Sequence, residues 1–495
     1  MSFSSLQEFA KYLEKIGQLK RITTPVSSNL EITEIHSRVI KKGGPALLFE
    51  NVNKGINKNY DIPLLANLFG TVERVALGIN KKQDELRKLG KMLAFLRQPK
   101  PPEGIKETFE MLPLIKNAIA MKPRQVKQAA CQEVILQGDE IDLEQFPIQN
   151  CWPGEPGPLI SWPIVITKGS GEDQRDKTNL GIYRMQVLNK NTTLMRWLKH
   201  RGGAGQFDRW KRKYTKPFPT AVVIGADPAT IISAVMPIPD NVSEFQFSGI
   251  LSGNRLPTVK CKTIPLEVPA NAEIVLEGHT LIDQQKDEGP YGDHTGYYNS
   301  IEKFPIFKIS AITMRKKPFY LSTFTGRPPD EPSILGEALN EIFIPLIQQQ
   351  FPEIVDFWLP PEGCSYRIAI VSIKKQYPGH AKRIMMGIWS FLRQFIYTKY
   401  VIVVDDDIDA RSWNDVMWAV STKSDPSKDI TVIENTPIDY LDFASPLPGL
   451  GGKMGIDATN KLFPETDREW GKEIIRDIKI KKLVTEKWEK YGLNL

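Results

Sequence analysis

The order of strand-like and helical segments changes twice along the 495 residues, which restricts the chain to a fold of several domains. From about residue 330, apolar runs alternate with helical segments in a β-α-β-α-β order, which predicts a parallel sheet with right-handed crossovers. Residues 130–325 instead contain strand-like runs separated by Gly/Pro-rich loops, which predicts a β-barrel or a β-sandwich. The N-terminal residues combine two amphipathic helices with short apolar runs and predict a small α/β unit.

Three domains are therefore expected: an N-terminal α/β unit with a basic connector over 1–125, a central domain over 126–330 and a C-terminal α/β domain over 331–495. Ser5 and Glu8 have capping-box spacing, so a helix is expected from Leu6, and a second helix from about Glu31 to Ile40. Later helices are expected over Ala381–Tyr397 and 412–422. Strands are expected over Ile164–Thr167, Ala221–Gly225, Glu273–Glu277, Phe307–Met314, Arg367–Lys374, Tyr400–Asp406 and Asp429–Asn435.

The net charge of +7 is unevenly distributed. Residues 80–130 contain twelve Lys or Arg against five Asp or Glu, so this segment alone carries +7. A net charge of +7 is small for a chain of 495 residues, which argues against a dedicated nucleic-acid-binding protein. Leucines recur at helical spacing from Leu86 to Leu96 and predict a basic amphipathic helix around 82–97. This helix either lies against an anionic membrane surface or is a solvated connector packed on the barrel.

The four cysteines form no CxxC pair and are widely spaced, which is typical of a reducing cytosol and not of a disulfide or zinc framework. The segment from Met1 to Phe9 lacks the pattern of a signal peptide. No apolar run reaches the roughly 18 residues needed to span a bilayer. We expect a cytoplasmic protein, soluble or peripheral on the cytoplasmic face of a membrane.

Residues suited to binding an acidic or phosphorylated ligand are concentrated in two neighbouring runs. NLGIYR, residues 179–184, is followed by Arg196 and by HRGG, residues 200–203. Guanidinium groups bind phosphate or carboxylate, and paired glycines allow a ligand close to the backbone. The alternative is a basic loop with a turn. Glu244, which follows a Pro-rich loop, is by itself more typical of a solvated carboxylate.

The run EGPYGDHTGYY begins at Glu288 and places Asp293 five residues later. Its Gly-Pro…Gly turn can bring the two carboxylates together, and each then raises the proton affinity of the other. This matters because an unperturbed Asp, with a pKa of about 3.9, is a poor proton donor at pH 7. The run predicts either an acid–base site or an acidic surface turn.

Two further runs are weaker indications of a binding site. Gly449–Asp457 is rich in glycine, contains Lys453 and predicts a flexible phosphate-binding loop. It lacks the Ser or Thr of a P-loop after the Lys and does not fit GxGxxG. The run Asp405-Asp406-Asp407 ends a buried strand, which is more typical of a polar strand end than of a metal site. We assign no chemistry to His36, His279 and His380.

Together these runs resemble the UbiD decarboxylases over residues 4–472. The runs that carry the resemblance are NLGIYR, MRWLKHRGG, IGADPATI, EGPYGDHTGYY, TGRPPDEP, LPPEGCSYR, ENTPIDYLDFASP and KMGIDATNK. The resemblance is strongest to the branch that converts 4-hydroxy-3-polyprenylbenzoate to a 2-polyprenylphenol and CO2 in quinone biosynthesis. It implies a non-oxidative decarboxylase whose central domain is a flavin-reductase-like split β-barrel that binds the cofactor.

The implied cofactor is prenylated FMN, bound with Mn2+ or Mg2+ and often with K+. Loss of CO2 from an sp2 carbon leaves charge that no side chain delocalises, so a cofactor must act as electron sink. Asn179, His200 and Glu244 match the metal ligands, a donor set that suits Mn2+ or Mg2+. The positions that match cofactor contacts are Ile182, Tyr183, Arg184, Arg196, Trp197, Leu198, Arg201, Gly202, Val235, Met236 and Lys453.

Arg184, Glu288 and Asp293 match the catalytic arginine and two acids of the family. The implied roles are that Arg184, paired with Glu288, orients the substrate carboxylate and Asp293 protonates the ring carbon. Some members have Glu where this chain has Asp293, so a covalent route and a quinoid route both stay open. The resemblance also implies a flavin prenyltransferase that supplies the cofactor, and a homo-oligomer, dimer or hexamer, formed through the C-terminal domain.

Other functions remain as alternatives. The same scaffold can decarboxylate a different aromatic acid. A flavin oxidoreductase is disfavoured because hydride transfer does not need two paired acids, and no dinucleotide fingerprint is present. An RNA-binding or scaffolding role of the basic segment would show as salt-sensitive binding.

Overall fold

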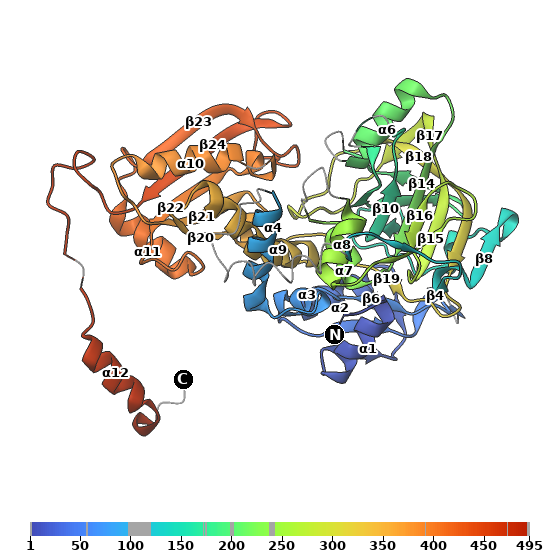
Figure 1. Ribbon diagram of the computed structural model, residues 1–495, viewed down its shortest axis with the longest axis horizontal. Coiled ribbons are helices and arrows are strands. Elements are labelled where there is room, and N and C mark those ends of the chain that lie inside the picture. The colour runs from blue at the N-terminus through green and yellow to red at the C-terminus, as the bar shows by residue number, and fades with distance from the viewer. Residues whose placement is uncertain are drawn as a thin grey trace.

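The protein is seen in a computed structural model that describes residues 2–55, 58–97, 120–171, 173, 176–198, 202–236, 243–391, 393–472 and 474–492. The architecture is mixed α/β and multidomain, as predicted. A large central sheet and a C-terminal sheet form two lobes, with α9 (Glu331–Gln350) between them and the N-terminal unit below the central lobe (Figure 1).

The N-terminal unit forms as the local signals predict. α1 (Leu6–Lys15) begins after Ser5, whose hydroxyl accepts the Glu8 main-chain N–H at 3.2 Å. α2 (Glu31–Ile40) has the predicted bounds, and α3 (Val72–Gly78) follows. A four-stranded sheet has the order β1 (Leu19–Ile22), β3 (Ala46–Phe49), β6 (Leu64–Ala66) and β19 (Tyr320–Leu321). A smaller sheet contains β2 (Val26–Ser27), β4 (Val52–Gly55) and β5 (Lys58–Asn59).

The predicted basic helix is present as α4 (Leu86–Arg97) and packs against α9. Leu86 and Leu89 are buried, and Arg87 pairs with Glu341 at 2.7 Å. Its apolar face is therefore used inside the protein, which favours the connector interpretation, although α4 packs on α9 and not on the barrel. Residues 98–119 of the basic segment lie outside the described part of the chain.

The central sheet has nine strands in one curved layer, so the sandwich alternative is wrong. Its path is β11-β10-β14-β17-β18-β13-β12-β9, and β8 also pairs with β18. The strands are β8 (Val134–Gln137), β9 (Leu159–Ile160), β10 (Pro163–Thr167), β11 (Asn179–Ile182), β12 (Met185–Asn189), β13 (Thr192–Met195), β14 (Phe218–Ile224), β17 (Ile274–Glu288) and β18 (Glu302–Met314).

The curvature follows from the chain connection. β11 is at one end of this path and β12 is next to the last strand at the other end. Only Tyr183 and Arg184 connect them, so the sheet must curl into a half-barrel that brings its ends together. Arg184 therefore lies at the seam of the curved sheet.

Other elements flank the central sheet. Three helices lie beside it, α6 (Gly202–Lys213), α7 (Pro228–Ser233) and α8 (Glu244–Ser252) (Figure 1). A small sheet has the order β16 (Glu267–Pro269), β15 (Pro257–Lys260) and β7 (Arg124–Gln125).

The C-terminal sheet contains the predicted β-α-β-α-β segments in a mixed sheet. β21 (Ile368–Ile373), β22 (Tyr400–Asp405) and β24 (Leu450–Ala458) are parallel. β20 (Ile354–Trp358) and β23 (Ile430–Pro437) form antiparallel edges, so the purely parallel prediction is wrong. The glycine-rich run predicted as a loop is β24, because its backbone pairs with strands on both sides. The helices are α10 (His380–Phe391) and α11 (Trp413–Lys423).

After β24 the chain leaves the C-terminal lobe and ends in α12 (Ile478–Glu486), which stands apart from the body (Figure 1). No helix in the described ranges is both long and apolar enough to cross a membrane. All four cysteines are free thiols.

Candidate active site

Arg184 holds the two predicted catalytic acids together. Its Nε and Nη2 contact the Glu288 carboxylate at 2.9 and 3.2 Å, and its Nη1 contacts Asp293 Oδ2 at 3.2 Å. Nη2 also donates to Asn299 Oδ1 at 2.6 Å. Glu288 is the last residue of β17, whereas Asp293 lies in the loop that follows. The predicted constellation is thus assembled at the seam of the half-barrel.

Arg196 adds a second guanidinium to this cluster. Its Nη1 lies 3.6 Å from Glu288 Oε2 and 3.8 Å from Asp293 Oδ2. Its Nη2 donates to the hydroxyl of Tyr440, which comes from the C-terminal part of the chain. Two positive and two acidic groups therefore share a largely buried site, and the surplus of N–H donors suits an incoming carboxylate.

The two acids differ in proton affinity. Burial, together with the nearby Asp293, raises the pKa of Glu288 to about 7, although Arg196 opposes this change. Burial would also raise the pKa of Asp293, but the hydrogen bond and charge of His294, with Arg196, outweigh it and lower that pKa. At pH 7 Glu288 is therefore about half protonated while Asp293 is ionised, and just below neutral pH the pair carries one proton, mainly on Glu288.

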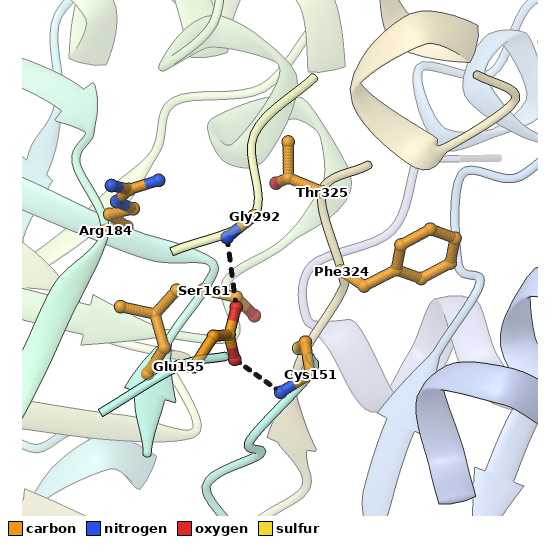
Figure 2. A pocket seen from close by; sticks show the side chains of 8 residues that line it. Cys151, Glu155, Ser161, Arg184, Gly292, Phe324 and Thr325 are labelled. Carbon is orange, nitrogen blue, oxygen red and sulfur yellow. Dashed lines mark hydrogen bonds between the residues drawn. The ribbon is translucent and has the colours of Figure 1, made fainter. Parts of the chain in front are cut away.

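Glu155 supports the loop that carries Asp293. Its carboxylate accepts main-chain N–H groups from Cys151 at 2.7 Å and Gly292 at 3.3 Å, as Figure 2 shows. Glu155, Gly292, Phe324 and Arg184 line a cavity of about 20 Å³. This volume holds a water molecule but no aromatic ring, so the cavity lies beside the reaction site and does not bind the substrate.

Two of the three predicted metal ligands lie close together. Asn179 begins β11, and Glu244 begins α8 and accepts the Leu180 N–H at 3.0 Å. A Cβ on Gly202, the first residue of α6, would overlap the Asn179 side-chain oxygen. The Asn179 amide nitrogen is buried without a hydrogen-bond partner among the described residues. The third predicted ligand, His200, lies outside those residues, as does Arg201.

The remaining predicted cofactor residues lie at or directly after the ends of β11, β13 and α7. Ile182 ends β11, and the buried Tyr183 accepts the Gly203 N–H at 3.3 Å. Trp197 is buried and Leu198 is half-buried after β13. Val235 and Met236 follow α7.

Lys453 is bonded within the C-terminal lobe. Its ammonium donates to the carbonyls of Ile396, Thr398 and Pro437 at 2.6, 2.9 and 3.2 Å, which uses all three N–H donors. Burial lowers the pKa of Lys453 to about 8. In this arrangement Lys453 acts as a tie between main-chain segments and has no free donor for a phosphate.

Asp405, at the end of β22, accepts from Lys423 at 3.1 Å and from the Asn460 N–H at 2.7 Å. These bonds fit the favoured interpretation of a polar strand end. Within the described ranges, no three or more His, Cys, Asp or Glu side chains are grouped as a metal site.

Sequence reasoning missed several residues of the site: Glu155, Asn299, Arg367, Asp439 and Tyr440. Asn299 was detectable in principle, because it follows the EGPYGDHTGYY run directly. Arg367 lies in the run LPPEGCSYR, and Asp439 and Tyr440 lie in ENTPIDYLDFASP, so these runs were visible, but only the fold brings them to the acids. Glu155 lies outside the quoted runs.

Models of one family match three consecutive segments of the chain. The 3-octaprenyl-4-hydroxybenzoate carboxy-lyase N-terminal domain matches residues 10–93, the Rift-related domain matches 124–328 and the C-terminal domain matches 333–458. The protein is therefore a carboxy-lyase in class. It belongs to the UbiD family of decarboxylases.

Solved structures agree with this assignment over nearly the whole length. The closed form of vanillic acid decarboxylase from Sedimentibacter hydroxybenzoicus is 28% identical, with a TM-score of 0.81 over 99% of this chain and 98% of that chain. The UbiD-class enzyme HmfF from Pelotomaculum thermopropionicum, in complex with FMN, is 28% identical, with a TM-score of 0.79 over 97% and 98%. An evolved dimeric form of HmfF, in complex with prFMN, gives 0.76 at the same identity and coverage.

Proposed function

We propose that this protein removes CO2 from 4-hydroxy-3-polyprenylbenzoate and releases a 2-polyprenylphenol in quinone biosynthesis. The observation that carries the decarboxylation is the contact of Arg184 with both Glu288 and Asp293. Through this contact Arg184, which can bind the substrate carboxylate, lies next to Glu288, which can hold a proton, in one buried site. The polyprenyl substrate follows from the resemblance of the motifs, and another aromatic acid on the same scaffold is the alternative.

The residues fit a flavin bound through a metal. We propose prenylated FMN with Mn2+ or Mg2+, and K+ as a further ion, on a split barrel related to flavin reductases. Asn179 and Glu244 supply hard oxygen donors, and the Asn179 amide nitrogen, which has no partner among the residues that the structure describes, is consistent with a polar ligand at this place. The lack of a side chain at Gly202 lets the Asn179 oxygen lie close to the start of α6. When bound, the prenylated flavin supplies the electron sink for the bond that breaks.

The protein groups bind the substrate and move its proton. Arg184 and Arg196 bind the substrate carboxylate and fix the bond to be broken. As CO2 leaves, the electron pair of the broken bond ends in a new C–H bond at the ring carbon. Glu288 holds the proton in the resting site, and we propose that it passes the proton through Asp293 to the ring carbon, so that Asp293 ends ionised as it began. Solvent then reprotonates Glu288. The transfer is downhill because the ring carbon is a far stronger base than either carboxylate.

Two partners complete the proposal. A separate flavin prenyltransferase supplies the cofactor, since its synthesis is a different reaction. A homo-oligomer, dimer or hexamer, forms through the C-terminal domain, a proposal supported by the evolved dimeric form of the UbiD-class enzyme HmfF.

The test is to incubate the flavin-loaded protein with a panel of 4-hydroxybenzoates that carry prenyl chains of increasing length. We expect CO2 release, a flavin visible spectrum and rates that rise with chain length. Vanillic acid and 3,4-dihydroxybenzoic acid are the comparison substrates. CO2 release from these acids alone would establish the alternative substrate class, and NAD(P)H oxidation without CO2 release would reject decarboxylation.

A further inference from the structure

We propose that His294 is a positioning residue that connects Asp293 to the Arg367–Asp439 pair of the C-terminal lobe. This inference rests on the proposed role of Asp293. It assigns a function to a residue that the motif contains but the reaction itself does not require.

His294 contacts charged groups on both sides of its ring. Nδ1 lies 2.8 Å from Asp293 Oδ1, and the His294 main-chain N–H donates to the same oxygen at 2.8 Å. On the other side, Nε2 lies 3.3 Å from Arg367 Nη1 and 3.8 Å from Asp439 Oδ2. The imidazole therefore lies between the Asp293 carboxylate on one side and the Arg367–Asp439 ion pair on the other.

The second carboxylate belongs to a different part of the chain. Arg367 lies directly before β21, and Asp439 follows β23. Arg367 Nη2 binds Asp439 Oδ2 at 3.0 Å and so fixes it beside the ring. The next residue, Tyr440, accepts from Arg196. Two consecutive residues of the C-terminal lobe thus contact the catalytic cluster, Asp439 beside His294 and Tyr440 at Arg196.

The charges around His294 favour the imidazolium. Burial opposes protonation, but the hydrogen bond and charge of Asp293, with Asp439, outweigh burial and Arg367 and raise the pKa of His294. Asp330 is a further acid close enough for the charge of His294 to oppose the burial that raises its pKa. An imidazolium donates to Asp293 and keeps that carboxylate ionised and oriented towards Arg184. Loss of Asp439 would lower the pKa of His294 and weaken this hold.

Histidine NMR tests the charge without any turnover. The chain contains five histidines, so His294→Gln identifies the ring resonance of His294 in selectively labelled full-length protein. We expect that resonance to titrate above the ordinary value of about 6.5 and to move to lower pH in Asp439→Asn. His279 on β17, whose pKa is lowered by burial, is the internal control, and its resonance should not change in Asp439→Asn. A titration of His294 at or below the ordinary value, or one unaltered in Asp439→Asn, overturns the proposal.

The pH profile tests the consequence for the loaded enzyme. In His294→Gln we expect kcat to fall about tenfold, less than the 10²–10⁴ typical of a lost acid–base group, with KM and bound flavin unchanged. The acid limb of kcat/KM should move to higher pH, because Asp293 then binds its proton more tightly.

His294→Asn serves as the second variant, because it keeps a short donor next to Asp293 but carries no charge and cannot reach Asp439. It should restore part of kcat and leave the acid limb displaced. A profile identical to wild type in both variants overturns the inference. If wild-type protein releases no CO2, the proposed function fails, and the NMR titration still decides the role of His294.

Discussion

Arg184 and Glu288 form a two-point ion pair at 2.9 and 3.2 Å, at the seam where the two ends of the central sheet meet. The pair fixes the plane of the guanidinium, so its remaining nitrogen faces Asp293. Neither residue is near the other in sequence. The active geometry is therefore a result of sheet closure.

Arg184→Lys should keep the positive charge but remove the forked guanidinium that contacts Glu288 at two points and Asp293 at a third. A lysine ammonium cannot bind Glu288 at two points and contact Asp293 as well. We expect a large loss of kcat/KM with increased KM for the aromatic acid, measured by CO2 release. Bound flavin, read from the visible spectrum, should remain. Unchanged kcat/KM would mean that the fork does not bind the substrate carboxylate.

Asp293→Asn should stop turnover and leave the cofactor bound. The amide cannot give up a proton, and the loss of an acid–base group costs about 10²–10⁴-fold in rate. The measurement is CO2 release per bound flavin, with Asp287→Asn, an exposed change on β17, as the matched control. Near-normal rates with flavin in place would show that Asp293 is not the donor.

The rate should fall as pH rises through about 7, because Glu288 has a raised pKa of about 7 and loses its stored proton there. At low pH both acids are neutral, so Arg184 and Arg196 lose the anions that orient them. The profile of kcat/KM should thus be bell-shaped. A rate that stays constant from pH 7 to about 9 would contradict Glu288 as the proton store.

Although Glu288 is paired with Arg184, burial raises its pKa, so its effect on folding stability has the opposite pH dependence from that of an acid with a lowered pKa. Its folded pKa lies above the ordinary value of 4.5, so its contribution is full below about pH 4.5 and is lost as pH rises to about 7. In Glu288→Gln, the thermal midpoint should depend less on pH across this window. An unchanged pH dependence would argue against the raised pKa.

Gly202→Ala should prevent binding of the cofactor and metal. The added methyl would overlap the Asn179 side-chain oxygen and displace a predicted ligand. Gly205→Ala is the matched control in the same helix, because its Cβ has room. Flavin and metal content after reconstitution are the measurements. Equal content in the two variants would remove Asn179 from the metal site.

Glu155→Ala should destabilise the loop that holds Asp293. It leaves the main-chain N–H groups of Cys151, Trp152 and Gly292 without their acceptor, and each buried unpaired group costs about 1–3 kcal/mol. We expect a lower free energy of unfolding, measured by denaturant titration, and lower activity. Glu155→Gln keeps an acceptor oxygen and should retain more stability. Equal loss in both variants would assign the effect to charge.

Local signals in the sequence predicted the helices well. Ser5 caps α1, and α2 runs from Glu31 to Ile40 as expected, because capping and apolar periodicity act within one helix. The sequence also predicted that Glu288 and Asp293 form an acid pair, since both lie in the short run EGPYGDHTGYY. Short-range physical chemistry decides these features.

Pairing between distant segments decided the rest. The glycine-rich run around Lys453 became β24 because strands on both sides supply its hydrogen bonds, and Lys453 is bonded to main-chain carbonyls. Glu155 joined the site from outside the quoted runs, and Asp439 and Tyr440 joined it from the run ENTPIDYLDFASP, in which we predicted no site residue. The sequence by itself determined the helices, the mixed α/β multidomain architecture and the family chemistry, because each depends on patterns of neighbouring residues. Only the tertiary structure decided which acid keeps its proton, because burial and the contacts of His294 set the pKa values of Glu288 and Asp293.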